Sequence, residues 1–348
     1  MKQPYYLTVG GRLRRRRRSL VLERADPDAP EDAPPKRLPI PIEQVDALYA
    51  LGEVDLNSKL VGLLARHGVL LHFFDYYGNY TATLYPRAGQ LSGRLHVLQA
   101  AHYLRPKRRL CLARAFARAA LFNMRRVLRY YRRRLPEDAR RRLDEACRLL
   151  GDQRDRLAHA SDVDEVFGLE GAARNAYYRA WNALPGIGEG PFAFTRRSRR
   201  PPRDPLNALI SFGNTLCYAA VLQKIYHTAL DPTIAYLHEP GDRRFSLALD
   251  LSEIFKPLLV DRTIFSLIRT GRLTEKHFEP HEDGVYLNET GRRRFVEHWD
   301  RRLRQTLFLE ESGRRVRYDE LLLLACHELI RHLNDPEAHP FTGFRLKG

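Results

Sequence analysis

Two carboxylates, a histidine and a lysine lie close together in the segment from Ala235 to Val260. Asp250 and Glu253 are three residues apart, so they lie side by side on a helix, and Lys256 continues the row. Together with His238, these donors and the adjacent cation are typical of a divalent-metal site for phosphate chemistry. For this segment alone, a solvated and salt-bridged helix face is the more ordinary interpretation.

Two features favour the metal site over the salt-bridged face. Asp250 stands inside the apolar run Leu-Ala-Leu-Asp-Leu, where an unpaired charge is costly to bury. A second segment, from Asp162 to Trp181, supplies another carboxylate, Glu170. The residues Gly171-Ala-Ala173 that follow it are small, so another helix or a metal can approach closely. The sequence therefore predicts that Glu170, His238 and Asp250 hold one ion.

Two helices must position these side chains. One is expected to begin at Ser246 as its N-cap and to meet no proline before Pro257. Its apolar residues recur at i, i+3 and i+4, which indicates one buried face. The other helix is expected over residues 162–181. The apolar positions of the first helix are Leu247, Leu251, Ile254, Phe255 and Leu258.

Composition indicates a globular protein with a nucleic-acid partner. The 348 residues are 44% hydrophobic, which gives room for two domains and a sizeable core. Lys and Arg number 59 against 42 acidic residues, a formal net charge of +17, which favours binding to phosphates. The longest aliphatic runs, such as Leu321 to Cys326, are far below the roughly 18 residues of a membrane span. The four cysteines form no C-x-x-C pair, so we expect no zinc site and a reducing cytoplasm.

Arginines are concentrated in a long helix expected over residues 110–134 and in a loop over residues 185–203. Arginines all around a helix most often form a solvated face, but this density without acidic partners in the helix favours a DNA backbone track. The side chains predicted to bind DNA are Arg125, Arg129, Arg132, Arg196, Arg197, Arg199, Arg200 and Arg203.

The pattern of elements divides the chain into two domains of an α+β protein. Residues 1–85 are rich in short strand patterns, residues 86–90 form a hinge, and residues 91–348 are helical almost throughout. A proline-rich loop interrupts the first domain at residues 26–35. The strands are expected at 5–9, 19–22, 47–51, 69–74 and 80–85, with a short helix at 56–67.

The chain resembles the family of CRISPR-associated endonuclease/integrases that insert new spacers, the first-numbered CRISPR-associated protein. The resemblance spans nearly the whole chain, and it also includes Leu38-Pro-Ile-Pro41, Leu51-Gly-Glu-Val54 and the Tyr-Gly turn that ends at Gly78. The proline-rich loop and the arginine runs at Arg14 and Arg196 depart from it. The segments that carry it most strongly are Leu169-Glu-Gly-Ala-Ala-Arg-Asn-Ala-Tyr177, Arg203-Asp-Pro-Leu-Asn-Ala-Leu-Ile-Ser-Phe-Gly213, Leu237-His238 and Phe245-Ser-Leu-Ala-Leu-Asp-Leu-Ser-Glu-Ile-Phe-Lys-Pro257.

The resemblance implies a small β-sandwich-like N-terminal domain followed by a larger all-α catalytic domain. It carries the metal-ligand roles onto Glu170, His238 and Asp250. Glu253 matches a second acidic residue of the family, and Lys256 matches a basic one. It also implies a homodimer that pairs with a small ferredoxin-like partner, the second-numbered CRISPR-associated protein. Because the N-terminal domain shows no cluster of carboxylates and histidine, we expect it to hold the dimer and the partner.

The function expected from the residues and the resemblance together is a Mg²⁺- or Mn²⁺-dependent DNA endonuclease and integrase. A 3′-hydroxyl of protospacer DNA would attack a phosphodiester of the CRISPR repeat in double-stranded DNA, and water would attack in the nuclease reaction. Neither reaction needs a protein nucleophile. The alternatives are a DNA-binding scaffold, in which the acidic residues form salt bridges only, and a generic metal-dependent nuclease.

Overall fold

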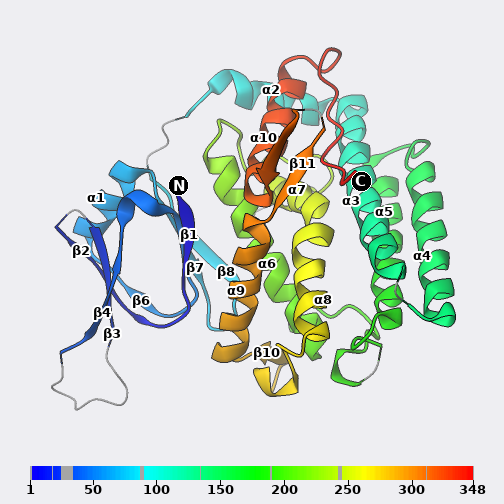
Figure 1. Cartoon of the computed structure of the whole chain (residues 1–348). Helices are drawn as coiled ribbons and strands as arrows, with labels where there is room; N and C mark the ends of the chain where they lie inside the picture. Colours follow the sequence, from blue (N-terminus) through cyan, green and yellow to red (C-terminus); the bar gives the residue numbers. More distant parts are fainter. Residues whose placement is uncertain are drawn as a thin grey trace. The chain divides into compact units, whose positions relative to one another are not determined.

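The computed structural model describes residues 2–17, 19–24, 34–86, 90–133, 135–188, 190–241, 245–310 and 312–347. The chain divides into two compact units, Met1–Gly89 and Gln90–Gly348 (Figure 1). Most of the proline-rich loop expected at residues 26–35 and of the hinge expected at 86–90 lies outside the described residues.

The described residues of the N-terminal unit form two four-stranded sheets and one α-helix. In the first sheet, with order β1-β5-β7-β8, the first three strands are parallel and β8 is antiparallel to β7. The second sheet has the order β4-β3-β2-β6. The elements are β1 (Gln3–Leu7), β2 (Gly11–Arg16), β3 (Ser19–Arg24), β4 (Lys36–Ile40), β5 (Val45–Ala50), β6 (Val54–Asp55), α1 (Ser58–His67), β7 (Leu70–Phe74) and β8 (Tyr80–Leu84).

Both sheets and α1 contribute to one hydrophobic cluster. Leu13 and Leu20 come from the second sheet, Leu48 comes from the first, and Leu60 and Leu64 come from α1; all five are fully buried. Alternating side chains of a strand point to opposite faces, which explains why each strand buries some of its residues and exposes others. The predicted α+β class is confirmed. The sandwich-like arrangement of the two sheets stays a prediction.

The second unit is mainly helical but not entirely so. Short antiparallel hairpins interrupt the helices, and the expectation of an all-α domain is corrected in this respect. Strands of three or four residues are too short to show a clear period in the sequence. The hairpins are β9 (Phe278–Pro280) with β10 (Val285–Leu287), and β11 (Thr306–Leu309) with β12 (Arg314–Arg317).

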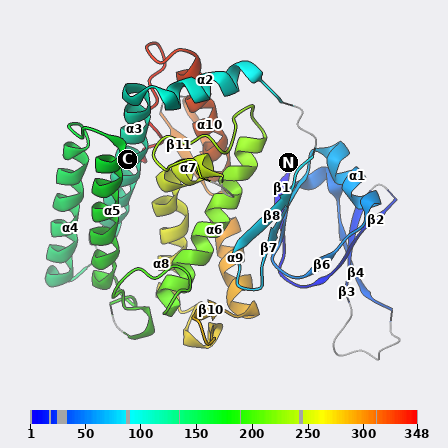
Figure 2. The same cartoon turned by 180° about the vertical axis from the view of Figure 1, so that it is seen from behind.

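Helix α3 packs against α4, α5 and α7, while α6 packs against α7 and α10 (Figure 2). The helices that carry Glu170 and Asp250 therefore share one support. The helices are α2 (Gly93–Leu104), α3 (Pro106–Arg132), α4 (Glu137–Arg156), α5 (Val163–Ala180), α6 (Pro205–Tyr226), α7 (Ser246–Lys256), α8 (Arg262–Arg269), α9 (Glu289–Arg304) and α10 (Tyr318–Asn334).

Among the helices of the described residues, only α6 has the length and the apolar composition of a membrane-crossing helix. However, 72% of that apolar stretch is buried within the protein, and α6 packs against α7 and α10. We therefore describe α6 as a core helix of the second unit.

The two ends of α7 differ from the expectation. Phe245, not Ser246, occupies the N-cap position and makes no side-chain cap, while the Ser246 hydroxyl donates to the carbonyl of Glu239. At the other end the helix does not stop at Pro257. A π-helical turn, Pro257–Asp261, continues directly into α8. A proline lacks the amide hydrogen of a regular helical turn, and the wider π turn accommodates that loss.

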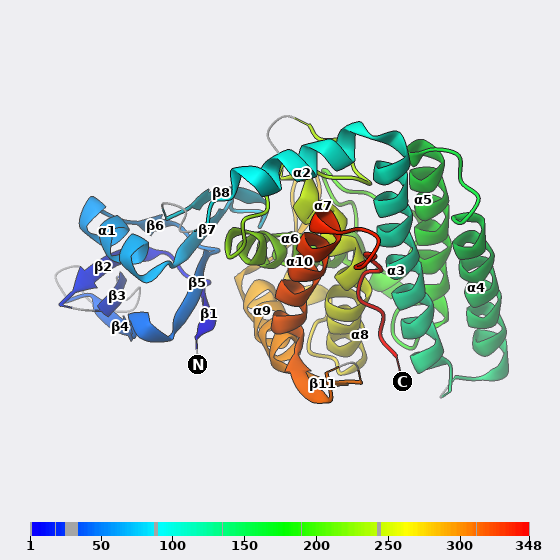
Figure 3. The same cartoon turned by 90° about the horizontal axis from the view of Figure 1, so that it is seen from above.

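Asn123 on α3 joins three parts of the helical unit that are distant in sequence. Its side-chain amide donates to the carbonyl oxygens of Ile254 and Phe344, both at 2.9 Å, and its Oδ1 accepts from the amide of Leu346 at 3.0 Å. The Phe344 ring also stacks on Phe255, with centroids 5.9 Å apart. The last segment of the chain therefore lies along α3 (Figure 3), is hydrogen-bonded to Asn123 and stacks on Phe255 of α7.

Gly213 on α6 packs so closely against its neighbours that one added methyl group should destabilise the protein. A Cβ at Gly213 would lie 2.5 Å from Val260 Cγ1 and 2.9 Å from Phe295 Cζ. We expect Gly213→Ala to lower the free energy of unfolding by about 1–3 kcal/mol because a packed core resists added volume. The measurement is urea unfolding. Gly168→Ala on α5 is the control: its methyl meets no described atom within 4 Å, so stability should rise by about 0.5–1 kcal/mol. Equal losses in both variants would contradict the packing argument.

Candidate active site

The predicted chemical residues come from two helices and from the loop before one of them. Helix α5 begins at Asp162, whose side chain accepts the amide of Glu165, and it carries Glu170. Helix α7 carries the acidic pair and the lysine, and His238 lies in the loop that precedes α7. The structure places Glu170, Asp250 and Glu253 in the interior, with exposed fractions of 7%, 0% and 7%.

Asp250 is fully occupied by the loop that contains His238. Its Oδ2 accepts the backbone amides of Tyr236 and Leu237 at 2.7 and 2.9 Å. Its Oδ1 accepts the amide of His238 at 2.9 Å and lies 2.7 Å from Nδ1 of the same histidine. The loop is held from the other side by α3, because Arg109 donates to the carbonyl of Tyr236.

The contact with Asp250 decides which nitrogen of His238 is available. A carboxylate can only accept a hydrogen bond, so Nδ1 of the neutral imidazole carries the hydrogen and Nε2 keeps a lone pair. Metal-binding histidines are commonly oriented in this way by a carboxylate on the other ring nitrogen. The ring edge of Phe167 packs against the imidazole, with centroids 5.6 Å apart. His238 is therefore held in a defined orientation.

Glu170 and Glu253 are joined by a residue that the sequence interpretation missed. Arg174, one turn after Glu170 on α5, donates from Nε to Glu170 at 2.7 Å and from Nη2 to Glu253. Lys256 donates to the other oxygen of Glu253. The only sequence signal was the i, i+4 spacing of Glu170 and Arg174, which is common on solvated helices. Here the pair is buried, with Arg174 only 8% exposed.

The cations determine the charge state of Glu253. Burial alone would raise its pKa, but Arg174, Lys256 and His238 outweigh burial and hold the pKa of Glu253 below its usual value. Burial likewise opposes the charge of Arg174, and Glu170 with Glu253 raises the pKa of this guanidinium well above its usual value. Glu253 is therefore a carboxylate, and Arg174 is a cation, at neutral pH.

A further acidic residue lies at the end of the π turn. Asp261 is 1% exposed, and its Oδ2 accepts the hydroxyl of Tyr177 on α5 at 2.9 Å. Its other oxygen, Oδ1, is buried and has no hydrogen-bond partner among the described residues. Burial raises the pKa of Asp261 to about 7, although Tyr177, Arg174 and Lys256 lower it. The predicted site residues on this helix reached only to Lys256, so Asp261 was not expected at the site.

The donor atoms suit a divalent ion, but the side chains as placed do not form a complete site. In the described part of the chain, no three His, Cys, Asp or Glu side chains are arranged so that they could hold a metal. Two carboxylates and an imidazole lone pair are suitable ligands for Mg²⁺ or Mn²⁺. However, the Glu170 and Glu253 side chains are bonded to Arg174 and Lys256, and Asp250 is bonded to backbone amides. The predicted convergence of Glu170, His238 and Asp250 is therefore not seen in this arrangement.

Comparison with known proteins identifies the family. The family model described as "CRISPR associated protein Cas1" matches residues 5–301. The chain belongs to the Cas1 family. A curated relative, a CRISPR-associated endonuclease Cas1 from Moorella thermoacetica, is 43% identical over 335 residues, which are 96% of this chain and 97% of the relative.

Solved structures of the Cas1 family agree with this assignment. A Cas1 protein from Thermotoga maritima has a TM-score of 0.82 at 35% identity and covers 99% of this chain and 100% of its own. Two more distant structures share the fold. A casposase bound to integration product has a TM-score of 0.84 at 22% identity, covering 99% of this chain and 94% of its own. A Cas6-RT-Cas1–Cas2 complex has a TM-score of 0.80 at 20% identity, covering 99% of this chain and 36% of its own.

The arginines predicted to bind DNA fall into two groups. Three of them contact other residues of the protein: Arg125 packs over Gly151, Arg132 forms a partly exposed salt bridge with Asp144 on α4, and Arg197 donates to Asn207 and Ser211. The long helix therefore does have acidic partners, which lie on the neighbouring helix. The arginines with exposed side chains are Arg129, Arg196, Arg199, Arg200 and Arg203.

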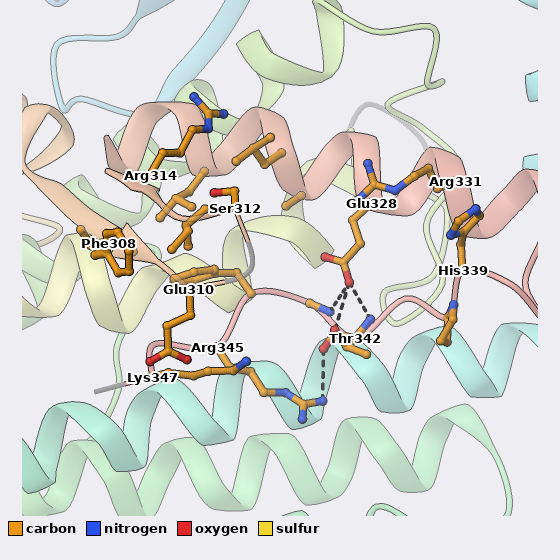
Figure 4. Close-up of a pocket in the computed structure, with 18 of the residues that line it drawn as sticks. Phe308, Glu310, Ser312, Arg314, Glu328, Arg331, His339, Thr342, Arg345 and Lys347 are labelled. Atoms are coloured by element: carbon orange, nitrogen blue, oxygen red, sulfur yellow. Dashed lines mark hydrogen bonds between the residues drawn. The ribbon is translucent and has the colours of Figure 1, made fainter. Parts of the chain in front are cut away.

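A cavity of about 650 Å³ lies between α10, the β11–β12 hairpin and the last segment of the chain (Figure 4). Phe308, Arg314 and Lys347 are among the residues that line it. Its carboxylate Glu328 is occupied, because it accepts from the amide and hydroxyl of Thr342 and from the amide of Gly343. None of the proposed chemical residues lines this cavity, so we do not assign the reaction to it.

Asp261 predicts a specific pH dependence of stability. Its pKa is raised from 3.8 to about 7 by burial, so the folded protein holds this proton more tightly than the unfolded chain. Its stabilising contribution is therefore complete below about pH 4 and is lost as pH rises towards about 7. The Asp261→Asn variant carries no such proton. The difference in free energy of unfolding between the variant and the unchanged protein should therefore shift in favour of the variant as pH rises from about 4 to about 7, and it should stay constant above that range. Urea unfolding at several pH values measures this difference, and a pH-independent difference would contradict the assignment.

Proposed function

We propose that this chain is a DNA integrase and endonuclease that joins protospacer DNA to a CRISPR repeat. The observation that carries the proposal is the orientation of His238 by Asp250, on the same helix as the buried Glu253, which Arg174 joins to the buried Glu170. The membership in the Cas1 family and the fold shared with a casposase bound to integration product support it.

The hydrogen bonds favour an exchange of two expected roles. Asp250 has both oxygens engaged by backbone amides and Nδ1 of His238, so we propose that it positions His238 and is not itself a ligand. Glu170, Nε2 of His238 and Glu253 would then hold Mg²⁺ or Mn²⁺. When bound, such an ion polarises a phosphate and stabilises the charge of the leaving oxygen. Lys256, next to Glu253, would balance phosphate charge.

The proposed reaction needs no covalent intermediate on the protein. The oxygen of a DNA 3′-hydroxyl forms a bond to phosphorus of the repeat, and the bond from phosphorus to the repeat 3′-oxygen breaks. The proton of the attacking hydroxyl is lost to solvent, and the leaving oxygen gains one. With water as the attacking group, the same exchange is hydrolysis. The task of the protein is to hold and orient the phosphate, which suits a site of carboxylates, imidazole and cations.

We also propose the partners that the family suggests. Double-stranded DNA would lie over the exposed arginines of the 196–203 loop and Arg129, since these side chains are open to solvent. One neighbour of similar fold is a Cas1–Cas2 complex, and we infer a homodimer that pairs with a small ferredoxin-like protein of the Cas2 kind. We expect the N-terminal unit to hold the dimer and the partner. All four cysteines are free thiols, which suits a reducing prokaryotic cytoplasm.

A DNA-binding scaffold without catalysis is the second candidate. It is favoured by one observation: Glu170 and Glu253 are both paired with cations, as they would be in a purely structural salt bridge. Such a scaffold would bind DNA and would gain no stability from Mn²⁺. A thermal unfolding series with Mn²⁺ and with a chelator separates the two candidates, because only the integrase binds the ion in its folded state.

The exchange of roles predicts different behaviour for two isosteric variants. Glu253→Gln should lose strand transfer and Mn²⁺ binding, and it should also lower the free energy of unfolding, because it leaves the buried cations Arg174 and Lys256 without the carboxylate that pairs with them. Asp250→Asn should lose strand transfer and also about 1–3 kcal/mol of stability, because an amide nitrogen cannot accept from the backbone amides. Gel shifts on the same preparations should show DNA affinity retained in both. Glu145→Gln, an exposed position on α4, is the control and should change stability by less than about 0.5 kcal/mol. A larger loss of Mn²⁺ affinity in Asp250→Asn than in Glu253→Gln would contradict the exchange.

The division of the arginines into exposed side chains and side chains bonded within the protein predicts how DNA binding depends on salt. The logarithm of the binding constant should fall linearly with the logarithm of salt concentration, with a slope of several units. Replacing exposed Arg196 and Arg199 with alanine should reduce the slope by about 2, one unit for each arginine that no longer binds a phosphate. Arg132→Ala should leave the slope unchanged, because Arg132 is already paired with Asp144. If Arg132→Ala reduced the slope as much as the exposed pair, the division of the arginines would be wrong.

A further inference from the structure

Arg174 is bonded to the same carboxylates that a metal ion would need as ligands. It is buried and bonded to both Glu170 and Glu253, the two carboxylates that are proposed as ligands. In this arrangement it provides the positive charge that two buried carboxylates need. A divalent ion at the same oxygens would meet a guanidinium at short range, and like charges in a buried site repel strongly. Arg174 therefore cannot keep both of its present contacts when the ion binds.

Asp261 offers an acceptor atom that has no hydrogen-bond donor among the described residues. This atom, Oδ1, is buried, and a buried acceptor without a partner is costly unless a donor becomes available. Asp261 lies in the same electrostatic environment, because Arg174, Lys256 and Glu253 all affect its charge state. Its second oxygen is held by Tyr177, which follows Arg174 by three residues on α5 and so lies on the same face of that helix.

The backbone around Asp261 supports a special role for this residue. The π turn Pro257–Asp261 follows directly after Lys256 and ends at Asp261. π turns within helices are rare and occur frequently at functional sites. This turn places a carboxylate in the interior, where a permanently unpaired charge would be unfavourable.

We propose that Arg174 is a displaceable counter-ion, which leaves Glu253 when a divalent metal binds and pairs instead with Asp261. This inference rests on the proposed function, because it assumes that Glu170 and Glu253 hold the ion. Arg174 and Asp261 are positioning residues under this proposal, since neither needs to touch the DNA. After the transfer the ion would balance the charge of Glu170 and Glu253, and the guanidinium would pair with Asp261, to which no cation of the described residues is bonded in the present arrangement. The transfer also explains why the present arrangement of the described residues shows no complete three-ligand group.

The test is the affinity for Mn²⁺ alone, measured by calorimetry on the full chain without DNA. Asp261→Asn keeps the size of the side chain and an acceptor for Tyr177 but removes the charge that would receive Arg174. We expect its dissociation constant for Mn²⁺ to rise by about 10- to 100-fold, the usual range for residues that act behind the ligands. Asp300→Asn is the matched control, because Asp300 is a half-buried acid paired with Arg304 and lies on α9. It should leave Mn²⁺ affinity unchanged.

A double-mutant cycle with Arg174→Met separates this coupling from a general loss of structure. Without the guanidinium no cation has to move, so Mn²⁺ should bind at least as tightly as to the unchanged protein. Asp261→Asn should then have no further effect in the Arg174→Met background. The Arg174→Met protein should also be less stable without metal, and Mn²⁺ should raise its melting temperature more than that of the unchanged protein. If Arg174→Met does not fold, the comparison of Asp261→Asn with Asp300→Asn decides alone.

The outcomes distinguish this proposal from the proposed function. If the unchanged protein binds no Mn²⁺, the metal-dependent function fails and the transfer of Arg174 fails with it. If the unchanged protein binds Mn²⁺ and Asp261→Asn binds it equally well, the transfer alone is overturned. The same holds if Asp261→Asn weakens binding equally in the presence and absence of Arg174.

Discussion

A carboxylate that is buried in the helical unit must be paired with hydrogen-bond donors or with cations, and this constraint shapes the unit. Asp250, which is completely buried, meets this need with neutral donors, because three successive backbone amides of the preceding loop point at its two oxygens. The same bonds fix the path of the loop, since residues 236–238 can adopt this course only with the carboxylate at its centre. A single side chain on α7 therefore determines where His238 is placed.

Glu253, one turn along the same helix, meets the need with cations. The partners of Glu253 are the side chains of Arg174 and Lys256, which can turn about their own bonds, whereas the amides at Asp250 are parts of the backbone. The two neighbouring acids therefore differ in how readily their partners can be exchanged. A carboxylate held by backbone dipoles is part of the framework, whereas one held by side-chain cations can receive another ion. The chemical difference between Asp250 and Glu253 thus arises from their partners and not from their own structure.

Much of this arrangement could be predicted from the sequence, because it is local. The apolar spacing around Asp250 and the apolar setting of Glu170 identified α7 and α5 as buried helices with acidic residues. The partners were harder to predict, because they come from other elements. Asp144, which binds Arg132, lies on another helix, and the i, i+4 spacing of Arg174 could not show that it is buried.

Proline was the other source of error. Pro257 was the first expected interruption of the helix, and Asp261, which lies beyond it, was assigned to no site. The chain continues through a π turn because packing on both sides holds it there, with Leu258, Leu259 and Val260 fully buried. Tertiary contacts of this kind override a local preference, and they are invisible until the fold is known.

The three hydrogen bonds of Asn123 have a consequence for the time course of folding. One of them connects α3 to a residue 131 positions later in the chain, and the other two reach residues 221 and 223 positions later. Single helices form within about a microsecond, whereas contacts between distant residues must wait until the intervening chain has been brought together. The helices around α3 can therefore form early, whereas the bonds of Asn123 to Phe344 and Leu346 can form only after the chain between them has been brought together.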